Sequence, residues 1–213
     1  MSDQPFSDRV KVRSHPERAH YDHETACEIL DAGRHGHLTT ILDNDIRCVP
    51  MMYVRYGNSI HIHGRAHTPL MEHLLRKTRL CFAVTLIDGL VLARSVRYNA
   101  VNYRSIVLYG EATEVTDVRK KIESFEKLGA RNWPGPRKLT PPTRKQLDSV
   151  NLLEVPLAEF SIKIRTGPPL GHLPDDDPAL WSGHVDLKTI PSACHPDATT
   201  DSSVALSEWT SGW

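Results

Sequence analysis

The sequence lacks the features that mark several common protein classes. Its four cysteines form no CxxC pair and are too scattered for a disulfide framework: Cys27, Cys48, Cys81 and Cys194. The longest apolar run, Leu80–Ala93, is broken by Asp88-Gly89 and is too short to cross a bilayer. The opening MSDQPFSDRVKVR has no apolar segment behind its charges, so it does not resemble a secretory signal. We therefore expect a cytoplasmic protein with reduced thiols and no membrane association.

An excess of charge of either sign is also missing. The chain has 26 Lys and Arg against 26 Asp and Glu, whereas a dedicated nucleic-acid binder is normally basic. The charges separate only locally: residues 119–145 carry nine basic and two acidic residues, and residues 175–213 carry one basic and seven acidic residues. This pattern predicts a basic face and an acidic tail, and it argues against a nucleic-acid partner.

The common catalytic and nucleotide-binding motifs are absent as well. There is no glycine-rich phosphate loop, no GxSxG and no GxGxxG, which argues against a P-loop protein, an α/β-hydrolase and a Rossmann protein.

The apolar patterning predicts mostly strands. Strands are predicted over 37–42, 47–56, 59–63, 80–87, 90–95, 102–115, 152–155 and 159–165, with hairpin turns at Gly57-Asn58 and Asp88-Gly89. Helices are predicted from Asp22 to Gly33, over 68–77, and from Thr116 or Asp117 to Gly129. Because strands follow one another without regular helix alternation, we expect an antiparallel barrel with helices in its gaps. Residues 1–20 are predicted to be a loose arm, 21–184 the folded domain, and 185–213 an extended or mobile tail.

Histidine is abundant, with twelve in the chain. His61 and His63 leave one face of a strand, and His35 and His37 repeat that spacing. Two such pairs could bind a metal, but no carboxylate or thiolate supports them, so interface or half-buried histidines are the preferred interpretation and no metal site is expected.

The segment after His63 has the pattern of a phosphate-binding site. The chain turns at Gly64 and enters a helix at Thr68, and a helix N-terminus with Arg65 nearby would favour an anion. A plain helix cap with a solvent-facing arginine explains the same residues equally well.

Two further clusters carry charge on predicted strands. Tyr103 and Ser105 share one face, whereas Arg104 lies on an aliphatic face and therefore needs a carboxylate, a phosphate or a subunit boundary as its partner. Lys163 and Arg165 share a face of the last predicted strand. Trp181 would stack on a flat ligand or close an apolar seam, and the seam is preferred.

Several blocks, taken in order, resemble one known family. These are HGHLTT, RCVPMMYV, NSIHIHG, LLRKTRLCFAV, TLIDGLVLARS, NYRSIVLYGEATEV, SIKIRTGPP and WSG. Together they resemble the pyridoxamine 5′-phosphate oxidase-like flavin-binding split barrels, in the branch of the nitroimidazole-resistance and flavin-nucleotide-binding proteins. The resemblance covers Cys27 to Gly183, and DGLVLARS, NYRS and KIRTGPP are its most specific parts.

This resemblance implies a mainly β (α+β) fold: a six-stranded antiparallel split β-barrel of Greek-key type, with flanking helices, that works as a homodimer. FMN would lie in the groove between subunits. The cofactor-binding positions that it implies are Arg47, Val49, Pro50 and Met51 under the ring, Arg65 and Thr68 at the phosphate, Ser105 near the reactive edge, and Lys163, Arg165 and Trp181 from the partner subunit.

The chain departs from that family pattern at two places. Relatives of this branch tend to have Ser-Arg where this chain has Thr68-Pro69, and His-His-Ser where it has Tyr98-Asn99-Ala100. The first change removes an arginine from the phosphate end, which Arg65 or His67 could replace. The second changes the residues expected to line the pocket, which suggests a different substrate or cofactor.

The resemblance therefore favours an FMN-dependent oxidoreductase that acts on a small molecule, with Tyr98, Tyr103 and Arg104 as candidate catalytic residues. Two alternatives stay open. One is a haem-binding or haem-modifying barrel that uses the strand of His61 and His63, and the other is a diverged barrel that has lost its redox cofactor.

Overall fold

The computed structural model describes residues 4–132, 140–171, 176–190, 192–193 and 195–200. Its helices are α1 (His23–Ala32), α2 (Pro69–Leu75), α3 (Val118–Asn132) and α4 (Arg144–Asp148), with 3-10 turns η1 (Pro16–Arg18) and η2 (Val96–Tyr98). As predicted, Asp22 caps α1: its carboxylate accepts a hydrogen bond from the Thr25 N–H at 2.8 Å.

The strands form one antiparallel sheet. They are β1 (Ala19–His20), β2 (His35–Leu42), β3 (Asp45–Tyr56), β4 (Ser59–Arg65), β5 (Arg79–Leu92), β6 (Ala100–Glu111), β7 (Thr113–Glu114), β8 (Val150–Pro156), β9 (Glu159–Arg165) and β10 (Gly183–Asp186). Their spatial order is β1-β9-β6-β5-β2-β3-β4-β8-β7, and β10 pairs with β5. Because β5 returns beside β2 after the β2-β3-β4 meander, the order contains a Greek key.

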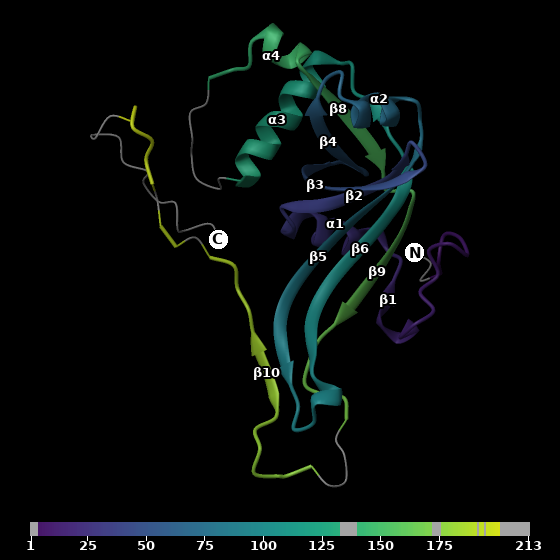
Figure 1. The fold of residues 1–213 in the computed structure, drawn as a ribbon, viewed down its shortest axis with the longest axis vertical. Helices are drawn as coiled ribbons and strands as arrows, with labels where there is room; N and C mark the ends of the chain where they lie inside the picture. Colours follow the sequence, from purple (N-terminus) through teal and green to yellow (C-terminus); the bar gives the residue numbers. More distant parts are fainter. Residues whose placement is uncertain (1–3, 133–139, 172–175, 191, 194, 201–213) are drawn as a thin grey trace.

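The sheet curls because two strands that follow each other in the chain, β8 and β9, pair near its opposite ends. β8 pairs with β4 and β9 pairs with β6, although only Leu157 and Ala158 join them, so this connection draws the two ends of the sheet together (Figure 1). Side chains such as Ile62, Phe82 and Ile162 fill the interior. The predicted mainly β, antiparallel split barrel is confirmed, but six strands is wrong. Ten are present in the described residues: seven longer strands, and three short ones, β1, β10 and β7, that pair with the exposed edges of β9, β5 and β8.

β3 bends and changes its partner halfway along. Residues Asp45–Met52 pair with β2, whereas Tyr53–Tyr56 pair with β4. The Gly57-Asn58 hairpin between β3 and β4 is as predicted, with Gly57 at φ 59°. The pairing of β3 with β4 ends at Tyr53 and Ile62. The part of β3 before Tyr53 and the part of β4 after Ile62 do not pair with each other, and this separation is the split of the barrel.

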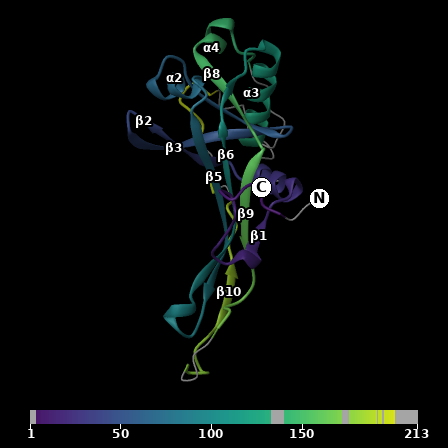
Figure 2. The same cartoon turned by 90° about the vertical axis from the view of Figure 1, so that its right-hand side faces the viewer.

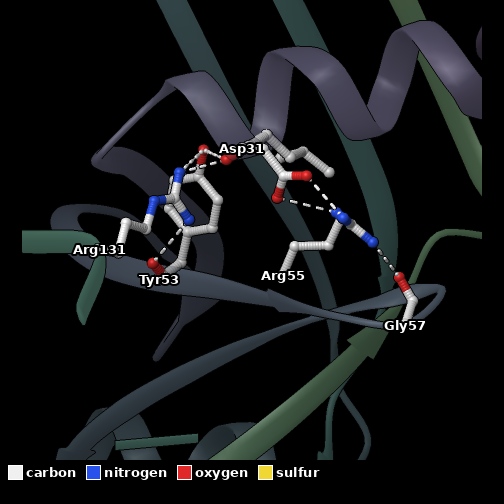
Figure 3. Close-up of polar contacts among 6 residues, drawn as sticks. Asp31, Tyr53, Arg55, Gly57 and Arg131 are labelled. Carbon is white, nitrogen blue, oxygen red and sulfur yellow. Dashed lines mark hydrogen bonds and ion pairs between the residues drawn. The ribbon is translucent and has the colours of Figure 1, made fainter. Parts of the chain in front are cut away.

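The bend is held from both sides by Tyr53 and Arg131 (Figure 3). The fully buried Tyr53 hydroxyl donates to the carbonyl of Leu30 at 2.8 Å, near the end of α1. Arg131, near the end of α3, donates to the carbonyls of Leu30 and Tyr53, and its guanidinium lies 4.6 Å from the Tyr53 ring centre. The last turn of α1 thereby gains donors for carbonyls that have no partner within the helix. In the same view Arg55 of β3 pairs with Asp31, with their closest atoms 2.6 Å apart, which adds a second tie between β3 and α1.

β5 and β6 extend beyond the barrel as a long arm, and β10 pairs along the outer edge of β5 (Figures 1 and 2). We define the arm as residues 88–102 and 183–186. The predicted turn at Asp88-Gly89 is wrong, because β5 continues through it with a bulge between Ile87 and Gly89. Asp88 instead forms a two-point ion pair with Arg104, at 2.7 and 2.9 Å, so the carboxylate alternative for Arg104 is the one that the structure contains.

Several boundaries also differ from the prediction. Gly129 does not end α3, which continues to Asn132. In the described part of the N-terminal segment, Val10 is buried and Ala19–His20 pair with β9, so these residues pack on the barrel instead of lying loose. β10 spans the predicted start of the tail at residue 185. In the part of the chain that the structure describes, no helix is long and apolar enough to span a bilayer.

Candidate functional site

The free edge of β3 is the first component of the site. Because β4 pairs only with Tyr53–Tyr56, the backbone of residues 45–52 has no strand partner on that side within the described residues. Unpaired N–H and C=O groups along such an edge can hydrogen-bond to a ligand. Arg47, Val49, Pro50 and Met51, the residues predicted to lie under the flavin ring, belong to this edge. Arg47 is exposed and pairs with Asp45 at 2.9 Å, while Met51 packs on the core.

Arg65 and Thr68, the predicted phosphate end, lie where β4 leaves β3. As predicted, Thr68 is the N-cap residue of α2 and Pro69 its first helical residue. The Thr68 hydroxyl donates to the carbonyl of Arg65 at 3.0 Å instead of accepting from an N–H of the helix, so Arg65 and Thr68 lie close together. Arg65 is exposed and has no ion pair in the described chain. Gly64 lies against α2 here: a Cβ at this position would lie 2.6 Å from the Met71 side chain, which would have to shift.

A second component is the outer face of the barrel sheet, on the side away from the core. By register it carries His35 and His37 of β2, Pro50 of β3, Ser105 of β6 and Lys163 of β9. His35 and His37 are exposed, with ring centres 6.1 Å apart, and neither forms a hydrogen bond within the described residues. Ser105 donates to the Lys163 carbonyl at 3.3 Å. This face therefore holds Ser105 and Lys163, two of the predicted cofactor-binding positions, side by side.

His63 lies on the opposite side of the split, under α3. It is half-buried, its ring lies 5.4 Å from that of Phe125, and it forms no hydrogen bond within the described residues. Burial lowers the pKa of His63, so its imidazole is neutral at pH 7 and can act as a donor ligand. Phe125 lines a largely apolar cavity of about 350 Å³ that is completed by Leu147, Val150 and neighbouring residues.

His61, two residues earlier, is fully engaged in packing. Ser124 donates its hydroxyl to the Lys120 carbonyl, so its oxygen accepts from His61 Nδ1 at 2.7 Å. The His61 ring stacks on Tyr56 at 4.7 Å, and burial lowers the pKa of His61 to about 4. Its buried Nε2 has no hydrogen bond and lies 3.9 Å from Glu154. His61 is therefore a structural residue of the α3–β4 contact.

The remaining predicted residues lie apart from these components in the single chain. Arg165 is buried and donates to the carbonyls of Gly167 and Pro168 and to Asn102. The Trp181 ring lies over Gly183 in the arm.

The three catalytic candidates do not gather in one place. Tyr98 packs against Gly171 at the end of the arm. Tyr103 lies on the outer face of β6, whereas Arg104 lies on the opposite face with Asp88. A site that used Tyr103 and Arg104 together would need a ligand on both sides of the sheet, so the chain by itself assembles no catalytic group from them.

No group of three His, Cys, Asp or Glu side chains suited to a metal ion occurs in the described parts of the chain. Cys27, Cys48 and Cys81 are free thiols, and Cys194 lies outside the described residues. No local sequence pattern indicates the open β3 edge, because its cause is the change of pairing partner at Tyr53.

The sequence matches the family model for pyridoxamine 5′-phosphate oxidase over residues 22–164, and comparison with the curated proteins finds no match. The structure of the flavocytochrome Anf3 from Azotobacter vinelandii is 30% identical, with a TM-score of 0.87, over 98% of this chain and 97% of that chain. The FAD and haem binding protein from Mycobacterium smegmatis is 25% identical, with a TM-score of 0.83, over 92% of this chain and 96% of that chain.

A more distant structure shares the fold alone. The FAD-binding protein from Mesorhizobium loti is 15% identical, with a TM-score of 0.51, over 70% of this chain and 98% of that chain.

Proposed function

The chain belongs to the pyridoxamine 5′-phosphate oxidase family, and from this premise we propose that it is a flavin-dependent oxidoreductase that also binds haem. The observation that carries the proposal is the likeness to Anf3, a flavocytochrome, over nearly the full length of both chains. The Mycobacterium smegmatis relative, which binds FAD and haem, matches over a similar length. Both relatives extend the likeness beyond the barrel into the arm and the segments around it.

The residues present fit a flavin. The open backbone edge of β3 supplies donors and acceptors that suit the polar edge of an isoalloxazine ring, and Arg65 supplies a guanidinium for a phosphate. Ser105 and Lys163 lie on the outer face, across β5 and β2 from that edge. One chain does not bring Ser105 and Lys163 next to the β3 edge and Arg65. We therefore propose a homodimer in which each flavin contacts both subunits.

The residues present also fit haem. His63 is a neutral, half-buried imidazole without a hydrogen bond in the described chain, and its ring contacts Phe125, one of the residues that line the largely apolar cavity. Haem iron is commonly held by an axial histidine, so we assign this role to His63. His61 is excluded, because one ring nitrogen is bonded to Ser124 and the ring is enclosed under α3.

A bound flavin would supply hydride transfer, and haem would supply transfer of single electrons. The protein's own part is to position both groups, to exclude water and to admit a small-molecule substrate to the outer face. Tyr103 is the candidate for proton donation, because it is the one of the three catalytic candidates on that face. We propose a cytoplasmic location, in accordance with the scattered cysteines, and no nucleic-acid partner, in accordance with the neutral net charge.

The test is an absorption spectrum of the untreated protein beside its native mass. Flavin bands with a bound mass of FMN or FAD support the flavin assignment, and the mass decides between the two cofactors. FMN is the form expected from the sequence, and FAD is the form bound by the Mycobacterium smegmatis relative. A colourless protein that takes up neither flavin would contradict the proposal and would support the diverged barrel.

Variants locate the two cofactors. Arg65→Gln is expected to weaken flavin binding at least tenfold, whereas Arg76→Gln, an exposed arginine that ends α2, leaves it unchanged. His63→Ala is expected to abolish the haem Soret band, and His37→Ala is expected to retain it. Loss of the band in His37→Ala alone would move the ligand to β2.

A further inference from the structure

His35 and His37 form an exposed histidine pair that neither the fold nor the proposed cofactors use. They alternate with Gly36 on β2, so both imidazoles leave the outer face of the sheet. Their ring centres lie 6.1 Å apart, and neither ring forms a hydrogen bond or an ion pair within the described residues. Each neutral imidazole therefore has one ring nitrogen with a lone pair open to a ligand.

The backbone that carries the pair is held on three sides. β2 lies between β3 and β5, and His37 is directly opposite Pro50 on one side and Ala83 on the other (Figure 1). On the inner face the Phe82 ring packs so closely that it would collide with a Cβ on Gly36. The spacing of the two histidines is thus fixed by the strand, while the short side chains of Pro50 and Ala83 leave the space above His37 open.

The observed spacing suits one metal ion shared by both rings. An ion bound to a ring nitrogen lies about 2 Å from that nitrogen and about 3.2 Å from the ring centre. Two rings on one ion can therefore have their centres up to about 6.4 Å apart. Because the centres of His35 and His37 are 6.1 Å apart, small side-chain rotations bring one nitrogen of each ring to a common ion without a change in the backbone.

A sulfur donor lies on the same face. Met52 of β3 is directly opposite His35, so its side chain leaves the sheet on the same side, and it is 40% exposed. Among the outward side chains of β2 and β3, and of the part of β5 that pairs with β2, there is no Asp or Glu. The His, Cys, Asp and Glu side chains of the described chain form no metal-binding group of three, so the third donor here is a thioether.

This donor set is soft and uncharged. Thioether and imidazole ligands favour copper, and thioethers in particular favour its monovalent form, whereas Mg²⁺, Ca²⁺ and Mn²⁺ prefer carboxylate and carbonyl oxygens. Zinc sites in proteins are completed by thiolate, imidazole or carboxylate ligands instead of thioethers.

We propose that His35, His37 and Met52 bind one Cu(I) ion on the outer face of the β2–β3 ladder, each histidine through one ring nitrogen and Met52 through its sulfur. The proposal does not depend on the flavin or on haem, because the assigned haem ligand His63 lies on the opposite side of the split, under α3.

Anaerobic competition for Cu(I) between the full-length holoprotein and the coloured chelator bicinchoninate tests the proposal. Wild type is expected to bind one equivalent per chain, and X-ray absorption at the copper edge is expected to show two nitrogen neighbours and one sulfur neighbour. His35→Asn and His37→Asn are each expected to weaken Cu(I) binding about 100-fold. His184→Asn, a histidine of β10 in the arm, is the matched control and is expected to change the constant less than about threefold.

Met52→Leu separates the role of the sulfur from that of the shape. Leucine keeps a similar apolar volume but has no sulfur, so Cu(I) binding is expected to weaken about tenfold while Zn²⁺ binding by the histidine pair changes less than about threefold. A purely structural role of Met52 would change both metals alike.

Three results overturn the inference. The first is a wild-type protein that takes up no Cu(I) from the chelator. The second is loss of binding in Cys48→Ser with full binding in His35→Asn, because Cys48 is an exposed thiol on the same face, opposite Thr39, and would then be the ligand. The third is loss of the Soret band in His35→Asn, which would assign the histidine pair to haem.

Discussion

Replacing Arg131 with methionine tests whether the bend of β3 is held from α3. The methionine keeps the aliphatic stem but removes the donors to the carbonyls of Leu30 and Tyr53. Hydrogen bonds from a charged group contribute about 1.5–3 kcal/mol each, but burial lowers the pKa of Arg131, which shows that part of this gain offsets desolvation. We therefore expect the free energy of unfolding to fall by about 3 kcal/mol, or about 6–12 °C in Tm for a chain of this size.

Urea unfolding followed by circular dichroism measures this loss. Tyr53→Phe is expected to cost about 1–2 kcal/mol, because it removes the hydroxyl that donates to Leu30 and Gly33. Since Arg131 also donates to that hydroxyl at 3.3 Å, the double variant is expected to lose at least about 0.5 kcal/mol less than the sum of the two single losses. Arg119→Met, on the exposed face of α3, is the control and is expected to cost less than about 0.5 kcal/mol. An Arg131→Met protein as stable as this control would refute the account of the bend.

Three further predictions concern pH and the arm. Burial lowers the pKa of His61 from its ordinary 6.5 to about 4, so as the pH falls the unfolded chain takes up this proton before the folded chain does. The free energy of unfolding is therefore expected to fall by about 3 kcal/mol between pH 6.5 and pH 4. Urea titrations at pH 7.5 and 4.5 measure this difference, and it is expected to shrink in His61→Gln; an unchanged difference would assign it to other groups. Gly89→Ala is expected to detach β10 from β5, because the new Cβ would lie 2.8 Å from the Val185 carbonyl. Limited proteolysis should then cleave near β10 with little change in Tm. Resistance to proteolysis equal to that of wild type would contradict this prediction. Asp88→Asn is expected to cost at most about 1 kcal/mol, since the pair with Arg104 is one-third exposed; a loss above about 3 kcal/mol in urea unfolding would mean that the bulge depends on it.

Local signals in the sequence were sufficient for much of the fold. The Asp22 cap was predictable because its carboxylate accepts a hydrogen bond from an N–H only three residues later in the chain. The Gly57-Asn58 hairpin was predictable because glycine readily adopts the positive φ that such a turn requires. The charged Arg104 on an aliphatic face indicated a partner, and Asp88 is that partner. These features depend on neighbours in sequence or on the high cost of an unpaired charge.

Features that depend on tertiary pairing were not predictable. Asp88-Gly89 has the composition of a hairpin turn, but its carboxylate pairs with Arg104 and the strand continues through a bulge. Likewise, the free edge of β3 arises because β4 pairs only from Tyr53 onward, which no local pattern indicates. The family resemblance supplied the candidate positions on β3, β4, β6 and β9, and their separation in one chain is the basis for the homodimer proposed above.

The absorption spectrum of the untreated protein, read together with its native mass, addresses the central claim most directly. The account predicts flavin bands and a Soret band on a dimer whose mass includes both groups. A colourless chain that still binds neither a flavin nor haem after each is added would contradict it.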